Sequence, residues 1–292
     1  MKTEIKLDIQ AQPDDVTCGP SCLYSIYRYL GDKSISLRQV VDQIERLDHG
    51  GTLIEVLACH GLRRGLNATI YSYHVDLLDP TWFAEDGGVH DPEWVRERLS
   101  QQLEAKKGHQ RMRVATRAMR EFLRLGGDLR MEDLTPSLIS RILGKGTPIL
   151  TGLSSTYLYR ASREIETTNE DDDVKGEPQG HFVMLVGCDT EKREVLVADP
   201  LAHNPPYHTA KYRLSIHRLV SAVMLGAITH DANLLVLTPP EDWDPVKVIA
   251  EGKKDGALAT KEKKEVTKHT HKEGRDGKRH EGPKSDARKA RD

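Results

Sequence analysis

The sequence predicts an α+β fold, with helices concentrated in the first half of the chain and a mostly antiparallel sheet in the second. Apolar residues recur at helical spacing through much of the first half. From residue 148 onwards, short apolar runs separated by polar turns replace that pattern, as in β-hairpins. This segregated order argues against a doubly wound sheet, in which strands and helices alternate.

The helices are indicated by their spacing and by their end signals. A helix is expected over residues 20–30, because apolar residues are helically spaced there and Gly31 favours a C-terminus. Another should begin after Thr135, since Pro136 suits the first helical position. The remaining helices are expected over residues 37–47, 52–64, 92–107, 110–125 and 215–225.

The strands are shorter than the helices. Residues 181–188 and 194–198 should form two strands joined by a polar turn around residues 190–193. The loop over residues 160–180 contains the acidic run 170–173, which favours an exposed, mobile segment. Further strands are expected over residues 66–73, 148–153, 211–214 and 234–237, with an extended segment over residues 1–10 and a loop over residues 75–90.

Composition excludes several classes of protein. The chain has 292 residues and a formal net charge of −2. A membrane-spanning helix needs about 20 apolar residues, and the longest such stretch, residues 219–228, is about half that length. The first ten residues lack the apolar region of a signal peptide. Four cysteines in so long a chain do not form a disulfide scaffold. We therefore expect a soluble, cytoplasmic protein with no membrane partner.

A charged tail follows the predicted globular domain. Residues 251–292 contain 14 Lys or Arg and 9 Asp or Glu, a net of +5, which leaves −7 on the first 250 residues. With so few large apolar side chains, this segment cannot offset the entropy of ordering its backbone. We predict a domain over residues 1–245 and a disordered tail over 246–292. Mixed charge of this kind is more typical of a solubilising extension than of a nucleic-acid-binding segment.

A candidate nucleophile precedes the first helix. Cys18 comes immediately before Gly19 and Pro20, so its sulfur should lie at the helix N-terminus, where free N–H groups and the macrodipole favour a thiolate. Gln12 lies six residues upstream and is expected to return beside the sulfur, donating a side-chain N–H to a developing oxyanion. Cys22 lies one turn further along and is expected in the core.

A base and its orienting group are predicted in the second half. His181 opens one strand and Asp199 follows the next. If the turn of the hairpin is centred near residue 190, these two residues are almost equidistant from it and become near cross-strand neighbours. The Asp199 carboxylate should then accept the Nδ1–H of His181 and leave Nε2 facing the thiol.

These segments resemble the motifs of papain-superfamily cysteine peptidases, above all the double-glycine type that processes bacteriocin leaders. The resemblance covers residues 12–23, 180–183 and 197–200, in that order. It implies a papain-like fold in which Gln12 completes the oxyanion hole, Cys18 is the nucleophile, His181 the general base and acid, and Asp199 its orienter. The helical segment over 82–130 and the loop over 160–180 look like additions to the family's domain.

The sequence thus favours hydrolysis of a peptide or amide bond through a thioester on Cys18, with a peptide or protein as substrate and no cofactor. Transfer of the acyl group to an amine remains open, as does an idle papain-like module that only binds a peptide. Each site residue also has a structural interpretation, because a cysteine before a helix, a strand histidine and a strand-ending aspartate are all common. No metal site is expected, since neither Cys59-His60 nor the pair His203 and His208 has metal-ligand spacing.

Overall fold

The computed structural model describes residues 2–47, 51–106, 110–165 and 167–244. Its centre is an eight-stranded sheet, in which the strands follow the order β3-β2-β10-β4-β7-β8-β9 and β1 pairs with β7. Its strands are β1 (Lys2–Glu4), β2 (Asn67–Ser72), β3 (Asp128–Arg130), β4 (Ile149–Ser154), β7 (Gly180–Asp189), β8 (Glu194–Ala198), β9 (Lys211–Ser215) and β10 (Asn233–Thr238). The pairings within this sheet are antiparallel except for β2 with β3.

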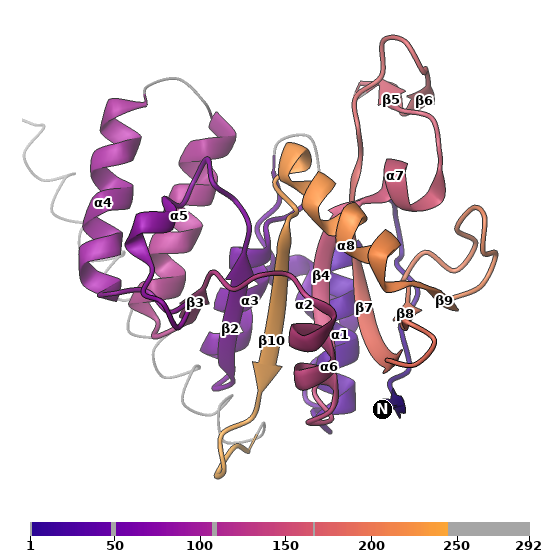
Figure 1. Cartoon of the computed structure of the whole chain (residues 1–292), viewed down its shortest axis with the longest axis horizontal. Coiled ribbons are helices and arrows are strands. Elements are labelled where there is room, and N and C mark those ends of the chain that lie inside the picture. The colour runs from indigo at the N-terminus through magenta and orange to yellow at the C-terminus, as the bar shows by residue number, and fades with distance from the viewer. Residues whose placement is uncertain (1, 48–50, 107–109, 166, 245–292) are drawn as a thin grey trace, which may run out of the picture. The chain divides into compact units, whose positions relative to one another are not determined.

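Helices cover both faces of the sheet. Figure 1 shows α1, α2 and α3 behind it and α6 and α8 in front, while α4 and α5 form a pair beside β2. Their bounds are α1 (Cys18–Tyr29), α2 (Leu37–Gln43), α3 (Ile54–Arg63), α4 (Pro92–Ala105), α5 (Gln110–Arg124), α6 (Pro136–Leu143), α7 (Ser155–Tyr159) and α8 (Ile216–Leu225), with the 3-10 helices η1 (Pro80–Trp82) and η2 (Gly226–Thr229).

The predicted α+β class is confirmed, with α1 carrying Cys18 and the sheet carrying His181. The expected order of helices first and sheet second is only partly right, because β2 and β3 come from the first half and belong to the same sheet. The short elements α7 and β3 had no sequence signal, since a helix of five residues and a strand of three are too short to show a period.

The segment over residues 82–130 is tied to α3 and to the sheet. The thiol of Cys59 donates to the carbonyl of Ala118 in α5 at 3.8 Å, and Arg63 pairs with Glu121 at 2.7 Å. The segment ends in β3, which pairs in parallel with β2. The two predicted helices of this segment are present, and its last three residues also extend the sheet.

The acidic loop is largely exposed and contains a small hairpin of β5 (Glu164–Ile165) and β6 (Glu170–Asp171). Arg163 donates to the carbonyl of Asp173 across this hairpin. The tail predicted over residues 246–292 lies outside the described residues. None of the helices in the described ranges is long and apolar enough to cross a lipid bilayer.

Candidate active site

Cys18 lies at the N-terminus of the first helix, as the sequence predicted, although α1 begins at Cys18 itself rather than at residue 20. A turn places it there, because Asp14 accepts hydrogen bonds from the Val16 N–H at 3.1 Å and from the Thr17 hydroxyl at 3.1 Å. Thr17 does not cap the helix with its side chain. The first N–H groups of α1 therefore remain available at the end of the helix where Cys18 lies, and they favour a negative charge there.

Two contacts bring this helix end to the sheet. The backbone N–H of Gln12 donates to the carbonyl of Pro200, just after β8, at 3.0 Å. A Cβ atom on Gly19 would lie 2.9 Å from the side chain of Thr52 and 3.1 Å from that of Phe182 in β7, so a larger residue here would crowd this close approach. The loop before α1 and the start of β7 thus form one compact site.

His181 and Asp199 meet as predicted, although their register differs from the expected one. The Nε2 atom of His181 lies 2.9 Å from Oδ1 of Asp199. In the observed register Ala198 pairs with Met184. Asp199, the next residue, therefore lies diagonally across from His181 rather than directly opposite it. The hairpin turn is centred further along the chain than residue 190, and the pairing shifts again between Leu185 and Gly187.

The predicted assignment of the two ring nitrogens of His181 is wrong. The carboxylate of Asp199 accepts from Nε2 rather than from Nδ1. Nδ1 is therefore the nitrogen left to face Cys18, which contributes to the raised pKa of His181. The strand register explains the difference. A carboxylate that lies diagonally across from His181, just beyond the end of β8, reaches Nε2, the ring nitrogen further from the His181 backbone.

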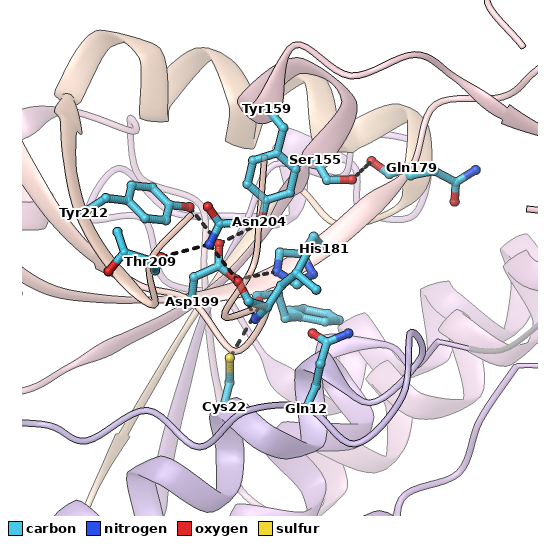
Figure 2. Close-up of polar contacts among 12 residues, drawn as sticks. Gln12, Cys22, Ser155, Tyr159, Gln179, His181, Asp199, Asn204, Thr209 and Tyr212 are labelled. Atoms are coloured by element: carbon cyan, nitrogen blue, oxygen red, sulfur yellow. Dashed lines mark hydrogen bonds and ion pairs between the residues drawn. The ribbon is translucent and has the colours of Figure 1, made fainter. Parts of the chain in front are cut away.

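Two tyrosines that the sequence analysis missed complete the surroundings of Asp199 (Figure 2). The hydroxyls of Tyr159 and Tyr212 donate to its Oδ2 at 2.6 and 2.8 Å. The backbone N–H of Leu201 donates to Oδ1 at 2.9 Å, beside His181. With these four donors the fully buried carboxylate has a partner on each oxygen, as a buried charge requires.

One of these tyrosines had a detectable signal. β9 alternates between exposed and buried residues, and Tyr212 is on its buried side. A buried tyrosine hydroxyl needs a partner, so this pattern indicates a polar acceptor beneath the strand. Tyr159 lies in α7, which has no recognisable period, and so it could not be found in this way.

Opposing effects determine the charges of His181 and Asp199. Burial alone would lower the pKa of His181, but the charge and hydrogen bond of Asp199 and the hydrogen bond with Cys18 raise it from 6.5 to about 10. Burial would raise the pKa of Asp199, but the charge and hydrogen bond of His181 and the two tyrosine hydroxyls hold it below its usual value. The arrangement therefore favours an imidazolium next to a carboxylate at neutral pH.

The other three cysteines lack these features. Cys22 is fully buried, and its thiol donates to the carbonyl of Phe182 at 3.5 Å. Burial raises its pKa well above the usual value, and it also raises the pKa of Cys59 and of Cys188. Cys22 thus belongs to the core, as the sequence predicted.

Gln12 lies next to His181 and Asp199, and Figure 2 shows its side chain extending from the loop before α1 towards His181. Its Nε2 donates to the carbonyl of Asp14 at 2.9 Å. Its Oε1 is buried and accepts no hydrogen bond from the described residues. An amide nitrogen carries two hydrogens, so one N–H of Gln12 is engaged by Asp14 and the second forms no hydrogen bond with the described residues.

Within the described ranges, no group of three or more His, Cys, Asp or Glu side chains is arranged to hold a metal ion. His60, next to Cys59, hydrogen bonds instead to Tyr27 at 2.6 Å and to Gln43 at 3.0 Å. Its neighbours in the fold are thus those of a core histidine.

No protein-family model matches the chain, and no curated protein does. Several solved structures are similar to it, among them two proteases. One is a double glycine motif protease from an AMS/PCAT transporter in complex with the leader peptide, at 13% identity and TM-score 0.37 over 82% of this chain and 99% of that one. The other is xylellain, a cysteine protease from Xylella fastidiosa, at 13% identity and TM-score 0.38 over 82% of this chain and 86% of that one.

The tyrosine contacts lead to a kinetic prediction. Tyr159→Phe removes one of the two hydroxyls on Oδ2 of Asp199, so the pKa of this carboxyl should rise and its hold on His181 should weaken. We expect kcat for the reaction proposed below to fall about fivefold, the equivalent of one hydrogen bond of ~1 kcal/mol. The acid limb of the pH–rate profile should move to higher pH.

Tyr27→Phe is the matched control, because Tyr27 is also a buried tyrosine with a hydrogen-bonded hydroxyl, but its partner is His60, outside this site. It should lower the melting temperature and leave the pH profile unchanged. If Tyr159→Phe behaves in the same way, Tyr159 only supports the fold.

Proposed function

We propose that this protein hydrolyses a peptide or amide bond through a thioester on Cys18. One observation carries the proposal: Cys18 opens α1 beside His181, whose other ring nitrogen bonds to the buried Asp199. A thiol, a base and a group that orients the base are the three parts of a nucleophilic catalyst. A purely structural role for the three side chains gives no reason to bury a charged carboxylate next to an imidazole and a thiol.

The reaction begins from the ion pair. The Cys18 proton resides on His181, and the thiolate attacks the carbonyl carbon of the substrate. Negative charge then develops on the carbonyl oxygen, which the backbone N–H of Cys18 and the second N–H of Gln12 stabilise. The imidazolium of His181 gives its proton to the leaving amine as the C–N bond breaks and the thioester remains.

Hydrolysis of the thioester uses the same residues. His181, now neutral, takes a proton from a water molecule, which attacks the acyl carbon. The same two N–H groups stabilise the second oxyanion. When this intermediate breaks down, the Cys18 thiolate leaves, the carboxylic acid product is released and His181 is again an imidazolium. No step needs a metal or an organic cofactor.

Fluorescence-quenched peptide pools and an added amine nucleophile test the proposal. Hydrolysis gives a free carboxylic acid at the new C-terminus, whereas acyl transfer gives an amide with the added amine. We expect the acid as the main product. If no pool is cleaved and no electrophile labels Cys18, the proposal is wrong and a peptide-binding module without catalysis replaces it. The expected peptide partner and the cytoplasmic location both remain predictions.

The pH dependence follows from the raised pKa of His181. The ion pair needs a protonated imidazole, so activity should persist through pH 8 and fall as pH rises through about 10. The same interaction stabilises the fold, with its contribution complete below the unfolded pKa of about 6.5 and lost as pH approaches 10. Initial rates and melting temperatures from pH 5 to 11 measure both effects. A neutral imidazole acting as a simple base predicts instead an acid limb near 6.5 and a flat profile above it.

A further inference from the structure

A second feature of the molecule lies at the end of the sheet that carries His181. A cavity of about 570 Å³ opens there, and its lining includes Ser154 and Pro178. Ser154 pairs with Gly180, the residue next to His181. Pro178 precedes His181 by three residues, so at 3.3–3.6 Å per residue the backbone between them spans at most about 10 Å. The backbone of His181 therefore lies within about 10 Å of Pro178 in the cavity wall.

The position of the cavity wall is fixed by contacts with the active-site strand. Ser155 donates to the carbonyl of Gln179 through its hydroxyl at 3.0 Å (Figure 2). The N–H of Gln179 donates to the hydroxyl of Thr156 at 2.9 Å. Thr156 lines the cavity, and it lies with Ser155 in the same short helix, α7, as Tyr159, which donates to Asp199.

Three arginines line the cavity: Arg160, Arg163 and Arg218. None of them forms an ion pair with a carboxylate in the part of the chain that the structure describes. Arg218 donates to the carbonyls of Tyr157 and Leu158 at 2.6 and 3.0 Å, and Arg163 donates to a backbone carbonyl. Three positive charges thus converge here with no carboxylate in contact.

One acidic residue of the loop, Asp172, interacts with the charge of Arg163. Asp172 has a lowered pKa, caused first by hydrogen bonds from the backbone N–H groups of Lys175 and Val174 and only last by the charge of Arg163. Its carboxylate is therefore already engaged by its own turn. The side chains that line the cavity thus include three arginines and no carboxylate.

The same cavity also has an apolar side. Tyr157, Leu225 and Ile228 line it and are 38, 41 and 65% exposed. The guanidinium of Arg218 lies 4.9 Å from the centre of the Tyr157 ring. Exposed apolar side chains gathered around a concave site mark an interaction surface.

We propose that this cavity is a substrate subsite that holds an acidic side chain of the peptide, next to an apolar one. The inference rests on the proposed peptidase function and adds a preference to it. The guanidinium groups of Arg160 and Arg163 bind the carboxylate, with a geometry that favours carboxylates over neutral amides. The apolar neighbour of that residue packs on Leu225 and Ile228.

Binding to the full-length Cys18→Ala chain tests the subsite without requiring turnover. The probes are acetylated and amidated decapeptide pools with Glu, Gln or Lys fixed at each position in turn, so that no terminal carboxylate contributes. At one or two positions, the Glu pool should bind about tenfold more tightly than the Gln pool. Raising the salt concentration should reduce this ratio, because the cavity is open to solvent.

Arg160→Glu is the decisive variant, because Arg160 is exposed and its guanidinium forms no hydrogen bond or ion pair with the described residues. In the Cys18→Ala background it should transfer the preference from the Glu pool to the Lys pool. Arg38→Glu is the matched control, since Arg38 is 91% exposed on α2 and does not line the cavity. It should keep the preference for Glu.

Equal binding of the Glu and Gln pools at every position would overturn the subsite, and so would a preference that survives both Arg160→Glu and Arg163→Glu. A different result would count against the peptidase alone. If the Glu preference is present but the unmodified chain cleaves no peptide, the cavity binds acidic peptides and the hydrolytic function is wrong.

Discussion

Replacement of Cys18 by alanine should abolish peptide hydrolysis, with a loss of about 10⁴-fold or more in kcat. The variant lacks the atom that forms the thioester, and no other described cysteine can take its place. Cys22, the nearest by sequence, is fully buried and hydrogen bonded to Phe182. Cys18 is a small buried side chain, 8% exposed, so the variant should fold and lose about 1 kcal/mol of stability or less.

Cys22→Ala is the matched control for this change. The two residues lie four positions apart in α1, so the same atoms are removed from the same helix. We expect the control to retain activity and to lose about 1 kcal/mol of stability, as a small buried hydrophobic residue does. Circular dichroism and initial rates on a cleavable peptide pool separate the two outcomes.

Chemical labelling gives a second readout that needs no substrate. Near neutral pH, iodoacetamide should modify Cys18 first, since burial raises the pKa of the other three thiols and covers them. Mass spectrometry of the digested protein identifies the labelled residue. If Cys22 is labelled and Cys18→Ala remains active, Cys18 is not the nucleophile.

The sequence predicted the main elements of the fold because most of them are long enough to show a period. The strand over residues 194–198 was predicted with its observed bounds, and the helix after Thr135 begins at Pro136 as expected. The parallel pairing of β2 with β3 could not be predicted. It joins two segments that the whole α4–α5 pair separates in the sequence, and only tertiary packing brings them together.

The site was predicted at the level of residues and not of atoms. Cys18 and His181 come from segments more than 160 residues apart, and their roles were inferred from local context alone. Which ring nitrogen faces Asp199 depends on the register of β7 with β8, and the irregularity between Leu185 and Gly187 leaves no mark in the sequence. The donors on Oδ2 come from α7 and β9, which no local pattern connects to a strand-ending aspartate.

Asp199→Ala should reduce kcat by about 10²–10⁴-fold, the range seen when the orienting residue of a triad is removed. Without the carboxylate, the His181 ring loses its hydrogen bond at Nε2 and the charge that raises its pKa. The change should also lower the melting temperature, because the hydroxyls of Tyr159 and Tyr212 lose their acceptor inside the core. The variant should therefore be less stable than the unmodified protein.

Asp199→Asn separates loss of charge from loss of packing. The amide fills the same space and its oxygen can still accept from His181, but the negative charge is gone. The basic limb of the pH–rate profile should then move down from about 10 towards the usual histidine value of 6.5. Asp189→Ala is the control, since Asp189 lies on the same hairpin but only accepts from the backbone N–H groups of Glu191 and Lys192 in its turn. If Asp189→Ala lowers kcat while a folded Asp199→Asn leaves both kcat and the pH profile unchanged, Asp199 does not orient His181, because a charge 2.9 Å from the imidazole cannot be removed without shifting its pKa.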